Sequence, residues 1–252
     1  MAAKKSKLTV TEDKTVEQAR RNYQMLKRLV EQWREERGSY WRQALTLADE
    51  PPYLPVRDLP AEAVIELWKR LNVAAQAEAP DSVLQKIWEQ FRDQKAAETD
   101  AEMSGRLQIA VSGAASLAGK LVAQKRAAAD NAGQGAGGSM RCPVCGQISI
   151  LAVLTPPDGK RIGLCTMCGY QWPVKRVGCL YCGSVDAKEQ IYLQNEAYPG
   201  VEMAVCRLCG QYCKEIDERK LSVQDYVWED LRTLPLNYAA ERWSAENRKK
   251  PN

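Results

Sequence analysis

Apolar side chains recur at helical spacing through the first 132 residues of the chain. Between residues 15 and 37 the apolar stripe consists of Val16, Tyr23, Leu26, Val30 and Trp33. Similar stripes occupy 60–71, 80–91 and 101–130. Residues three or four apart share one face of a helix, so this pattern predicts a bundle of amphipathic helices. The apolar faces are typical of a bundle core; the alternative is that part of one face forms a groove for a client segment.

Local signals set the expected ends of these helices. Gly38 predicts the end of the first helix, and the four prolines between residues 51 and 60 predict an extended connection. Asp58 is expected to cap the helix that follows. Near the C-terminus, Ser222 predicts the start of a helix that runs to about residue 243, with an interruption at Pro235.

From residue 148 the apolar period shortens towards two, which is the period of a strand. The first alternating run, 148–164, contains a Pro-Pro-Asp-Gly turn at 156–159. The second run, 191–205, contains a Tyr-Pro-Gly turn at 198–200. Each run therefore predicts a β-hairpin.

Composition divides the chain into domains. A glycine-rich stretch at 133–139 separates the predicted helices from the predicted hairpins and is typical of a flexible linker. The two hairpins are expected to pack as a tandem repeat, with Trp172 or Val174 buried between them. The predicted fold class is α+β multidomain, with an α-helical bundle at 1–132, a linker at 133–140, a first four-cysteine ribbon module at 141–178, a second at 179–221, and a C-terminal helix and tail at 222–252.

Cysteine and histidine usage narrows the chemistry. All nine cysteines lie between residues 142 and 213, and the chain contains no histidine. Ser–His and Cys–His catalytic pairs are therefore excluded, and we expect no enzymatic activity. No apolar run approaches the roughly 20 residues of a membrane helix, and none of signal-peptide length follows the basic N-terminus. We therefore expect a cytoplasmic protein, in which paired cysteines indicate metal binding rather than disulfides.

Eight of the cysteines form four Cys-x-x-Cys pairs. The two-residue gap lets one tight turn present both sulfurs to one ion, and a hairpin brings a second turn to its opposite side. A glycine follows each pair directly, and glycine tolerates the positive φ that such a turn requires. The predicted ligands of the first ion are Cys142, Cys145, Cys165 and Cys168, and those of the second are Cys179, Cys182, Cys206 and Cys209.

The donor set leaves two metals open. Zinc and iron both accept four thiolates in a tetrahedron, so the sequence predicts two metal ions, zinc or iron. Zinc would contribute on the order of 10 kcal/mol or more of folding free energy, and iron would add redox activity. Cys213, the ninth cysteine, is interpreted as a buried apolar side chain; a reactive thiol and an alternative ligand are the other interpretations.

The order of these motifs resembles the formate dehydrogenase accessory protein (FdhE) family. The resemblance is carried by Cys-Pro-Val-Cys-Gly at 142–146, Leu-Cys-Thr-Met-Cys at 164–168, Gln-Trp at 171–172, Val-Lys-Arg-Val-Gly-Cys at 174–179, Cys-Arg-Leu-Cys-Gly-Gln-Tyr at 206–212 and Glu-Asp-Leu at 229–231. Pro173 and Cys213 depart from the family's pattern but leave the eight paired cysteines intact. The resemblance implies rubredoxin-like metal modules and a role in maturing a molybdenum- or tungsten-dependent formate dehydrogenase, by binding its immature catalytic subunit.

Two other functions compete with this one. The first is a zinc-ribbon nucleic-acid binder, which should show a continuous basic face. The segment 141–178 has five basic residues and one acid, but 179–213 has two basic residues and four acids. Eight thiolates and two divalent ions would also bring the formal charge of +4 to about zero, so we expect no nucleic acid. The second is a rubredoxin-like electron-transfer protein, which requires iron that cycles reversibly.

Overall fold

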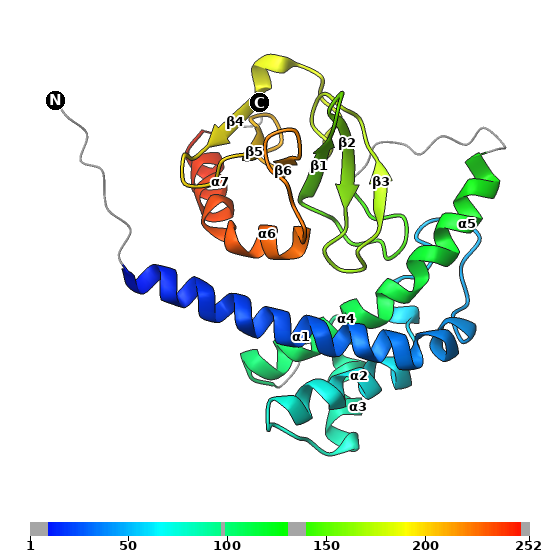
Figure 1. Ribbon diagram of the computed structural model, residues 1–252. Helices are drawn as coiled ribbons and strands as arrows, with labels where there is room; N and C mark the ends of the chain where they lie inside the picture. Colours follow the sequence, from blue (N-terminus) through cyan, green and yellow to red (C-terminus); the bar gives the residue numbers. More distant parts are fainter. Residues whose placement is uncertain (1–9, 97–98, 131–139, 248–252) are drawn as a thin grey trace.

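In the computed structural model of the 252-residue chain, residues 10–96, 99–130 and 140–247 are described. An N-terminal helical part, a mixed sheet and two C-terminal helices follow one another along the chain, which confirms the predicted α+β class (Figure 1). The predicted linker at 133–139 and the basic N-terminal tail lie outside the described residues. None of the helices in the described ranges has the length and apolar character needed to cross a membrane.

The helical part contains every helix that the apolar stripes predict. Its helices are α1 (Val10–Gln43), η1 (Val56–Asp58), α2 (Ala61–Ala74), α3 (Asp81–Arg92), α4 (Ala101–Ala115), η2 (Ser116–Ala118) and α5 (Gly119–Asp130). The predicted end of the first helix at Gly38 is wrong, because α1 continues to Gln43. A Cβ at residue 38 would lie 3.3 Å from Leu117 Cδ2, so this glycine lets α1 approach η2 closely. Trp41, in the extra turn, is then buried in the core.

Tryptophans form the centre of this helical core. Trp33, Trp68 and Trp88 are fully buried, on α1, α2 and α3 respectively. The carboxylate of Glu66 on α2 accepts hydrogen bonds from the indole N–H groups of Trp33 (2.9 Å) and Trp41 (3.2 Å). One carboxylate therefore provides the acceptor that both indoles of α1 need on burial.

The N-terminal ends of two helices differ from expectation. Asp58 lies in η1 and does not cap α2 with its side chain. Pro60 precedes α2 instead, and its carbonyl accepts from the backbone N–H of Val64. At the C-terminus, Ser222 is exposed, and Asp225 caps α6 (Tyr226–Arg232) by accepting from the backbone N–H groups of the second and third residues of that helix. The α6–α7 break falls at Thr233, just before Pro235 in the first turn of α7 (Leu234–Asn247).

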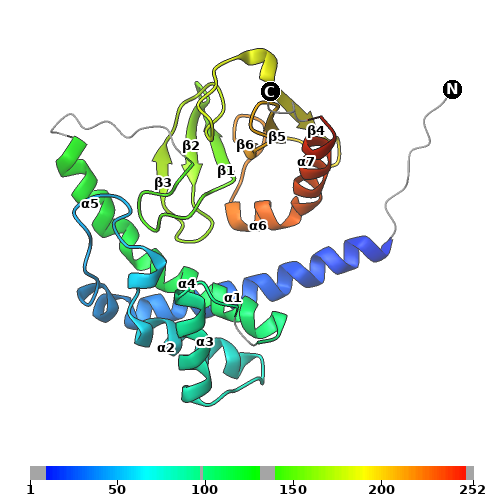
Figure 2. The same cartoon turned by 180° about the vertical axis from the view of Figure 1, so that it is seen from behind.

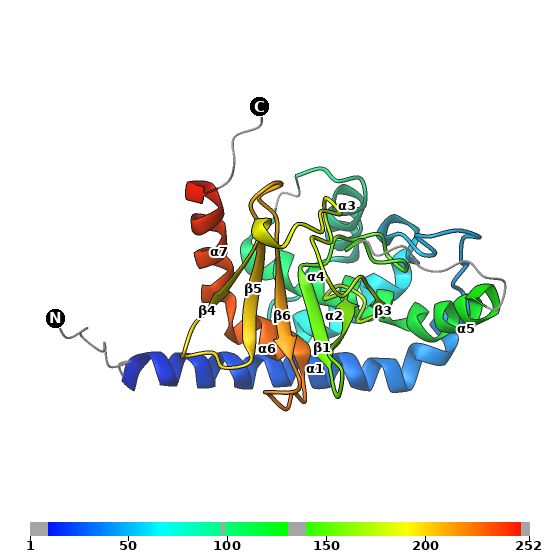
Figure 3. The ribbon, with the colours of Figure 1, turned by 90° about the horizontal axis from the view of Figure 1, so that it is seen from above.

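One six-stranded sheet spans both cysteine modules. The strands are β1 (Leu151–Thr155), β2 (Lys160–Leu164), β3 (Gln171–Pro173), β4 (Gln190–Gln194), β5 (Val201–Cys206) and β6 (Tyr212–Asp217), in the order β3-β2-β1-β6-β5-β4. The β1–β2 and β4–β5 pairs are the two predicted hairpins. β1 pairs with β6 in parallel, and this pairing joins the two halves edge to edge (Figure 3). The domain boundaries at 141–178 and 179–221 stay a prediction, but each of these segments contributes three of the strands.

The sequence predicts that Trp172 or Val174 lies between the two modules, and Val174, not Trp172, packs against residues of both. The Trp172 side chain belongs to the apolar cluster of the helical part, which also includes the first four cysteines, whereas Val174 packs against that cluster and against a small one that contains Ala152 and Leu180. The other face of the sheet is covered by α6 and α7, where Leu236 and Ala240 pack against Leu151 and its neighbours.

Helix α1 links the helical part to the C-terminal helices. It packs against α2 and η2 at one end and passes α6 nearer its N-terminus (Figure 2). There Asp225 accepts hydrogen bonds from the Tyr23 hydroxyl (2.9 Å) and the Lys27 ammonium (2.8 Å), and the Tyr23 and Trp228 rings lie 5.6 Å apart. The capping residue of α6 is therefore also its link to α1.

Candidate metal centres

Four turns of the same geometry carry the eight paired cysteines. In each, the glycine after the pair donates its N–H to the carbonyl of the first cysteine, as in Gly146 to Cys142 (2.9 Å). The first cysteine in turn donates to the carbonyl five residues later, as in Cys142 to Gln147 (2.8 Å). The glycine φ angles are +77° at Gly146, +71° at Gly169, +76° at Gly183 and +73° at Gly210. The predicted positive φ is confirmed at all four turns, which we call knuckles 1 to 4 in chain order.

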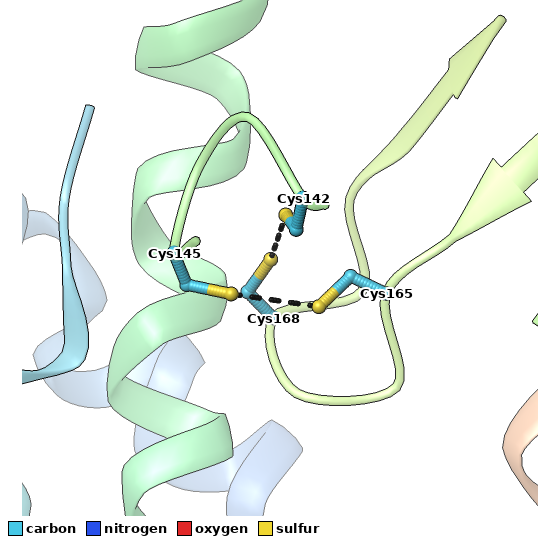
Figure 4. Close-up of side chains that lie close together, drawn as sticks. All are labelled: Cys142, Cys145, Cys165 and Cys168. Carbon is cyan, nitrogen blue, oxygen red and sulfur yellow. Dashed lines mark hydrogen bonds between the residues drawn. The ribbon is translucent and has the colours of Figure 1, made fainter. Parts of the chain in front are cut away.

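Knuckles 1 and 2 face each other and form a first sulfur tetrad. Cys142 Sγ lies 3.5 Å from Cys168 Sγ, and Cys145 Sγ lies 3.5 Å from Cys165 Sγ. Figure 4 shows the four sulfurs pointing towards one another from two loops that meet beside a helix. All four cysteines are buried.

The helical part covers this first tetrad. The backbone N–H groups of Tyr53 and Leu54 donate to the carbonyls of Pro143 (3.0 Å) and Val144 (2.8 Å), the two residues between the cysteines of knuckle 1. The segment after α1 therefore pairs with knuckle 1 much as a strand would. All four cysteines of the first tetrad belong to the same apolar cluster as the tryptophans of α1 and α2.

Knuckles 3 and 4 form a second tetrad with similar sulfur spacing but a different environment. Cys179 Sγ lies 3.6 Å from Cys209 Sγ, and Cys182 Sγ lies 3.8 Å from Cys206 Sγ. Cys182 is exposed and Cys209 is half-buried. The side-chain amide of Gln190 donates to Cys206 Sγ at 3.6 Å.

The spacing of the sulfurs fits a tetrahedral metal site. Metal–sulfur bonds of about 2.3 Å in a tetrahedron place sulfurs about 3.8 Å apart, whereas a disulfide needs about 2.0 Å. Within each tetrad the sulfurs all lie within 4.8 Å of one another. The structure thus brings together all eight predicted ligands in two groups, each positioned to hold one metal ion; that these sulfurs coordinate metal stays a prediction.

The first tetrad suits four metal-bound thiolates better than four free thiols. Sulfur–sulfur hydrogen bonds within the group raise the pKa of Cys145 and lower the pKa of Cys165, so the four thiols share protons unequally. A divalent cation removes this conflict, because it favours the thiolate form of every ligand at once.

Cys213 lies outside both tetrads. It is buried on β6, and burial raises the pKa of its thiol to about 12. Its Sγ donates to the Lys214 carbonyl at 3.6 Å. These observations match the interpretation of Cys213 as a buried side chain rather than a ligand or a reactive thiol.

The sheet also contains buried ion pairs that no sequence pattern predicts. Lys214 is fully buried and donates to Asp230 Oδ1 (2.6 Å) and to the Thr233 hydroxyl (3.0 Å), which fastens the α6–α7 corner to β6. On the opposite face, the Arg161 guanidinium pairs with the Glu215 carboxylate. β6 carries charged residues at 214, 215 and 217, which lie on both of its faces and are typical of an exposed strand, so the sequence contains no signal that both faces are buried.

Comparisons with known proteins agree with this arrangement. No family model matches the chain. An FdhE homolog of Aquifex aeolicus is 31% identical over 105 residues, and the FdhE protein of Salmonella choleraesuis is 31% identical over 103 residues. Each alignment covers 40% of this chain, and about a third of each relative: 36% and 33% of their lengths. The crystal structure of the FdhE protein from Pseudomonas aeruginosa superposes with a TM-score of 0.56 and 20% identity. The chain is therefore similar to FdhE proteins over part of its sequence and in its fold.

The structural match extends further than the sequence matches. It covers 87% of this chain and 82% of the Pseudomonas aeruginosa FdhE chain, whereas each sequence alignment covers 40% of this chain. The combination of a helical part, a mixed sheet with two cysteine tetrads, and a C-terminal helix is therefore an FdhE-type fold.

Proposed function

We propose that this chain is an accessory protein for the maturation of a molybdenum- or tungsten-dependent formate dehydrogenase, and that it binds the immature catalytic subunit. The observation that carries the proposal is the order of four identical knuckles around two tetrads, in a chain with similarity to proteins named FdhE. The proposed ligands are the eight cysteines predicted from the sequence. Each tetrad would hold one zinc or iron ion, which supplies a cross-link in either case and one-electron chemistry if it is iron.

The arrangement of the parts supports a binding role rather than catalysis. Contacts of α1 with α6, and of Tyr53 and Leu54 with knuckle 1, join the helical part to the cysteine-rich part, so segments far apart in the sequence lie side by side. The absence of histidine from the sequence removes the commonest general base. We therefore propose a non-enzymatic, cytoplasmic protein whose partner is a polypeptide.

The disposition of the basic residues also supports a protein partner over a nucleic acid. Of the five basic residues between 141 and 178, Arg161 is buried in an ion pair, and Arg141 and Arg176 donate to the carbonyls of Gly146 and Asp158. Arg141 and Arg176 are nevertheless exposed and keep their charge, but the segment 179–213 has two basic residues and four acids, so this module's basic residues do not continue into a basic face across both modules, as phosphate binding requires. A salt titration of DNA and RNA binding is expected to show no sequence-independent affinity at physiological ionic strength.

Affinity capture tests the proposed partner. The tagged chain is expected to recover the formate dehydrogenase catalytic subunit from cells that produce the dehydrogenase, and a tag-only control should not. Removing the gene is expected to lower formate dehydrogenase activity while the catalytic polypeptide is still made, and supplying the gene again should restore activity. Failure to recover the subunit under every condition in which the dehydrogenase is produced would refute the proposal.

A further inference from the structure

The two tetrads have the same donor atoms but unequal access to solvent. In the first, the exposed fractions are 1% for Cys142, 3% for Cys145, 1% for Cys165 and 4% for Cys168. In the second, Cys179 and Cys206 are buried, Cys209 is half-buried and Cys182 is exposed. A chelator or a thiol reagent can therefore approach the second tetrad directly but not the first.

The first tetrad is enclosed by contacts from the helical part on both knuckles. Knuckle 1 accepts the two backbone hydrogen bonds from residues 53 and 54. A Cβ at Gly146 would lie 3.2 Å from Pro52, so this glycine sits directly against the same segment. On knuckle 2, the Arg126 guanidinium of α5 lies 6.0 Å from the centre of the Tyr170 ring, and Met167 packs on the helical core. Access to these sulfurs requires the helical part to move away from the sheet.

The second tetrad lies in the half of the sheet away from these contacts. Figure 1 shows α5 on the β3 side of the sheet and β4 on the other side. α7 reaches knuckle 4 through the Ser244 hydroxyl, which donates to the Gly210 carbonyl at 2.7 Å, yet Cys182 remains exposed. Apolar side chains next to these knuckles are exposed as well: Leu208 by 44% and Val185 by 69%. The second tetrad is thus a surface feature.

We propose that the second tetrad is the metal-exchange site of the chain, where a soft divalent ion enters and leaves, and that the first tetrad is a permanent structural site that joins the helical part to the sheet. Release of an ion from the second tetrad leaves four thiolates, which either take up protons from solvent or bind an incoming ion of the same class. This inference rests on the proposed metal binding by the tetrads and not on the formate dehydrogenase partner, so failure to capture that partner leaves it standing.

The order of metal loss in the full, metal-loaded chain tests this directly. The protein is treated with excess EDTA and samples are labelled over time with N-ethylmaleimide, with metal counted in parallel and labelled peptides identified by mass spectrometry. One ion per chain is expected to leave first, together with labelling of Cys179, Cys182, Cys206 and Cys209. The other ion should leave at least about tenfold more slowly, because its release needs a local opening of the structure. The thiol of Cys213, which is buried but in neither tetrad, provides an internal reference.

Matched variants separate the two roles. Cys182→Ser is expected to lower the metal content from two ions to one and to leave hydrogen exchange at the amides of Tyr53 and Leu54 unchanged. Cys145→Ser is expected to raise exchange at those two amides, because the carbonyls that they donate to lie in the affected knuckle. The proposal would be overturned if both ions left at one rate, or if the cysteines of the first tetrad were labelled before those of the second. Increased hydrogen exchange at the Tyr53 amide in Cys182→Ser would overturn it as well. If a variant fails to fold, the labelling order in the unmodified chain still decides.

Discussion

Alanine substitutions at two glycines with different backbone conformations are expected to change stability in opposite directions, which tests the conformation assigned to the knuckles. Gly169 has a φ of +71°, and a Cβ added there would meet nothing within 4 Å. Gly105 lies inside α4, and a Cβ added there would also meet nothing within 4 Å. Alanine at the two positions is therefore the same chemical change in equally open space, and only the backbone conformation differs.

The expected energies follow from that conformation. An L-residue in the left-handed region costs about 1–2 kcal/mol, and the lower chain entropy of alanine in the unfolded state returns about 0.4–1 kcal/mol. Gly169→Ala should therefore destabilise the protein by about 1 kcal/mol. Gly105→Ala should stabilise it by about 0.5–1 kcal/mol, because glycine is a poor residue for a helix interior. For a chain of this size, each 1 kcal/mol corresponds to roughly 2–4 °C in Tm.

Thermal unfolding of the metal-loaded proteins measures this pair, with metal content determined on the same samples. Gly169→Ala should melt below the unmodified chain and Gly105→Ala above it. Gly146→Ala should lose more than Gly169→Ala, because its Cβ would also press on Pro52 at 3.2 Å. Equal Tm values for Gly169→Ala and the unmodified chain, or a loss in Gly105→Ala as large as that in Gly169→Ala, would refute the assignment of the knuckle conformation.

Three further predictions concern contacts away from the sulfurs. Glu66→Ala should cost about 2–3 kcal/mol, because it leaves two indole N–H groups of α1 without their acceptor, and urea unfolding followed by tryptophan fluorescence measures it; an unchanged midpoint would contradict this role. Asp225→Ala should cost about 1–2 kcal/mol by removing the cap of α6 and its link to α1, and hydrogen exchange should rise in α6 rather than in α3. The Arg219 guanidinium lowers the pKa of Asp217 to about 2, so its carboxylate stabilises the fold above pH 4, and this contribution is lost as the pH falls towards 2. The difference in unfolding free energy between the unmodified chain and Asp217→Asn should therefore shrink between pH 5 and pH 2, and a constant difference would show that the ion pair is not responsible.

The sequence predicts the knuckles well because their determinants are local. A two-residue gap and a following glycine lie within five consecutive residues, so the turn, the positive φ and the pairing of sulfurs follow from the chain itself. The apolar stripes predict the helices for the same reason. The helix end predicted at Gly38 is wrong because a glycine inside a helix costs only about 1 kcal/mol, and the burial of Trp41 outweighs that cost.

Contacts between segments far apart in the chain could not be predicted from the sequence. The parallel pairing of β1 with β6 joins residues about 60 positions apart, and neither strand carries a signal for that partner. The docking of Tyr53 and Leu54 on knuckle 1 uses backbone groups, which every residue has. The unequal exposure of the two tetrads follows from that docking, so two motifs that are equivalent in the sequence become different sites in the fold.

X-ray absorption spectroscopy of the purified protein, combined with metal counting, tests the central claim most directly. We expect two ions per chain, each surrounded by four sulfur atoms at about 2.3 Å and by no nitrogen or oxygen. Fewer than two ions per chain, a shell that contains nitrogen or oxygen, or disulfides within the Cys-x-x-Cys pairs would contradict it.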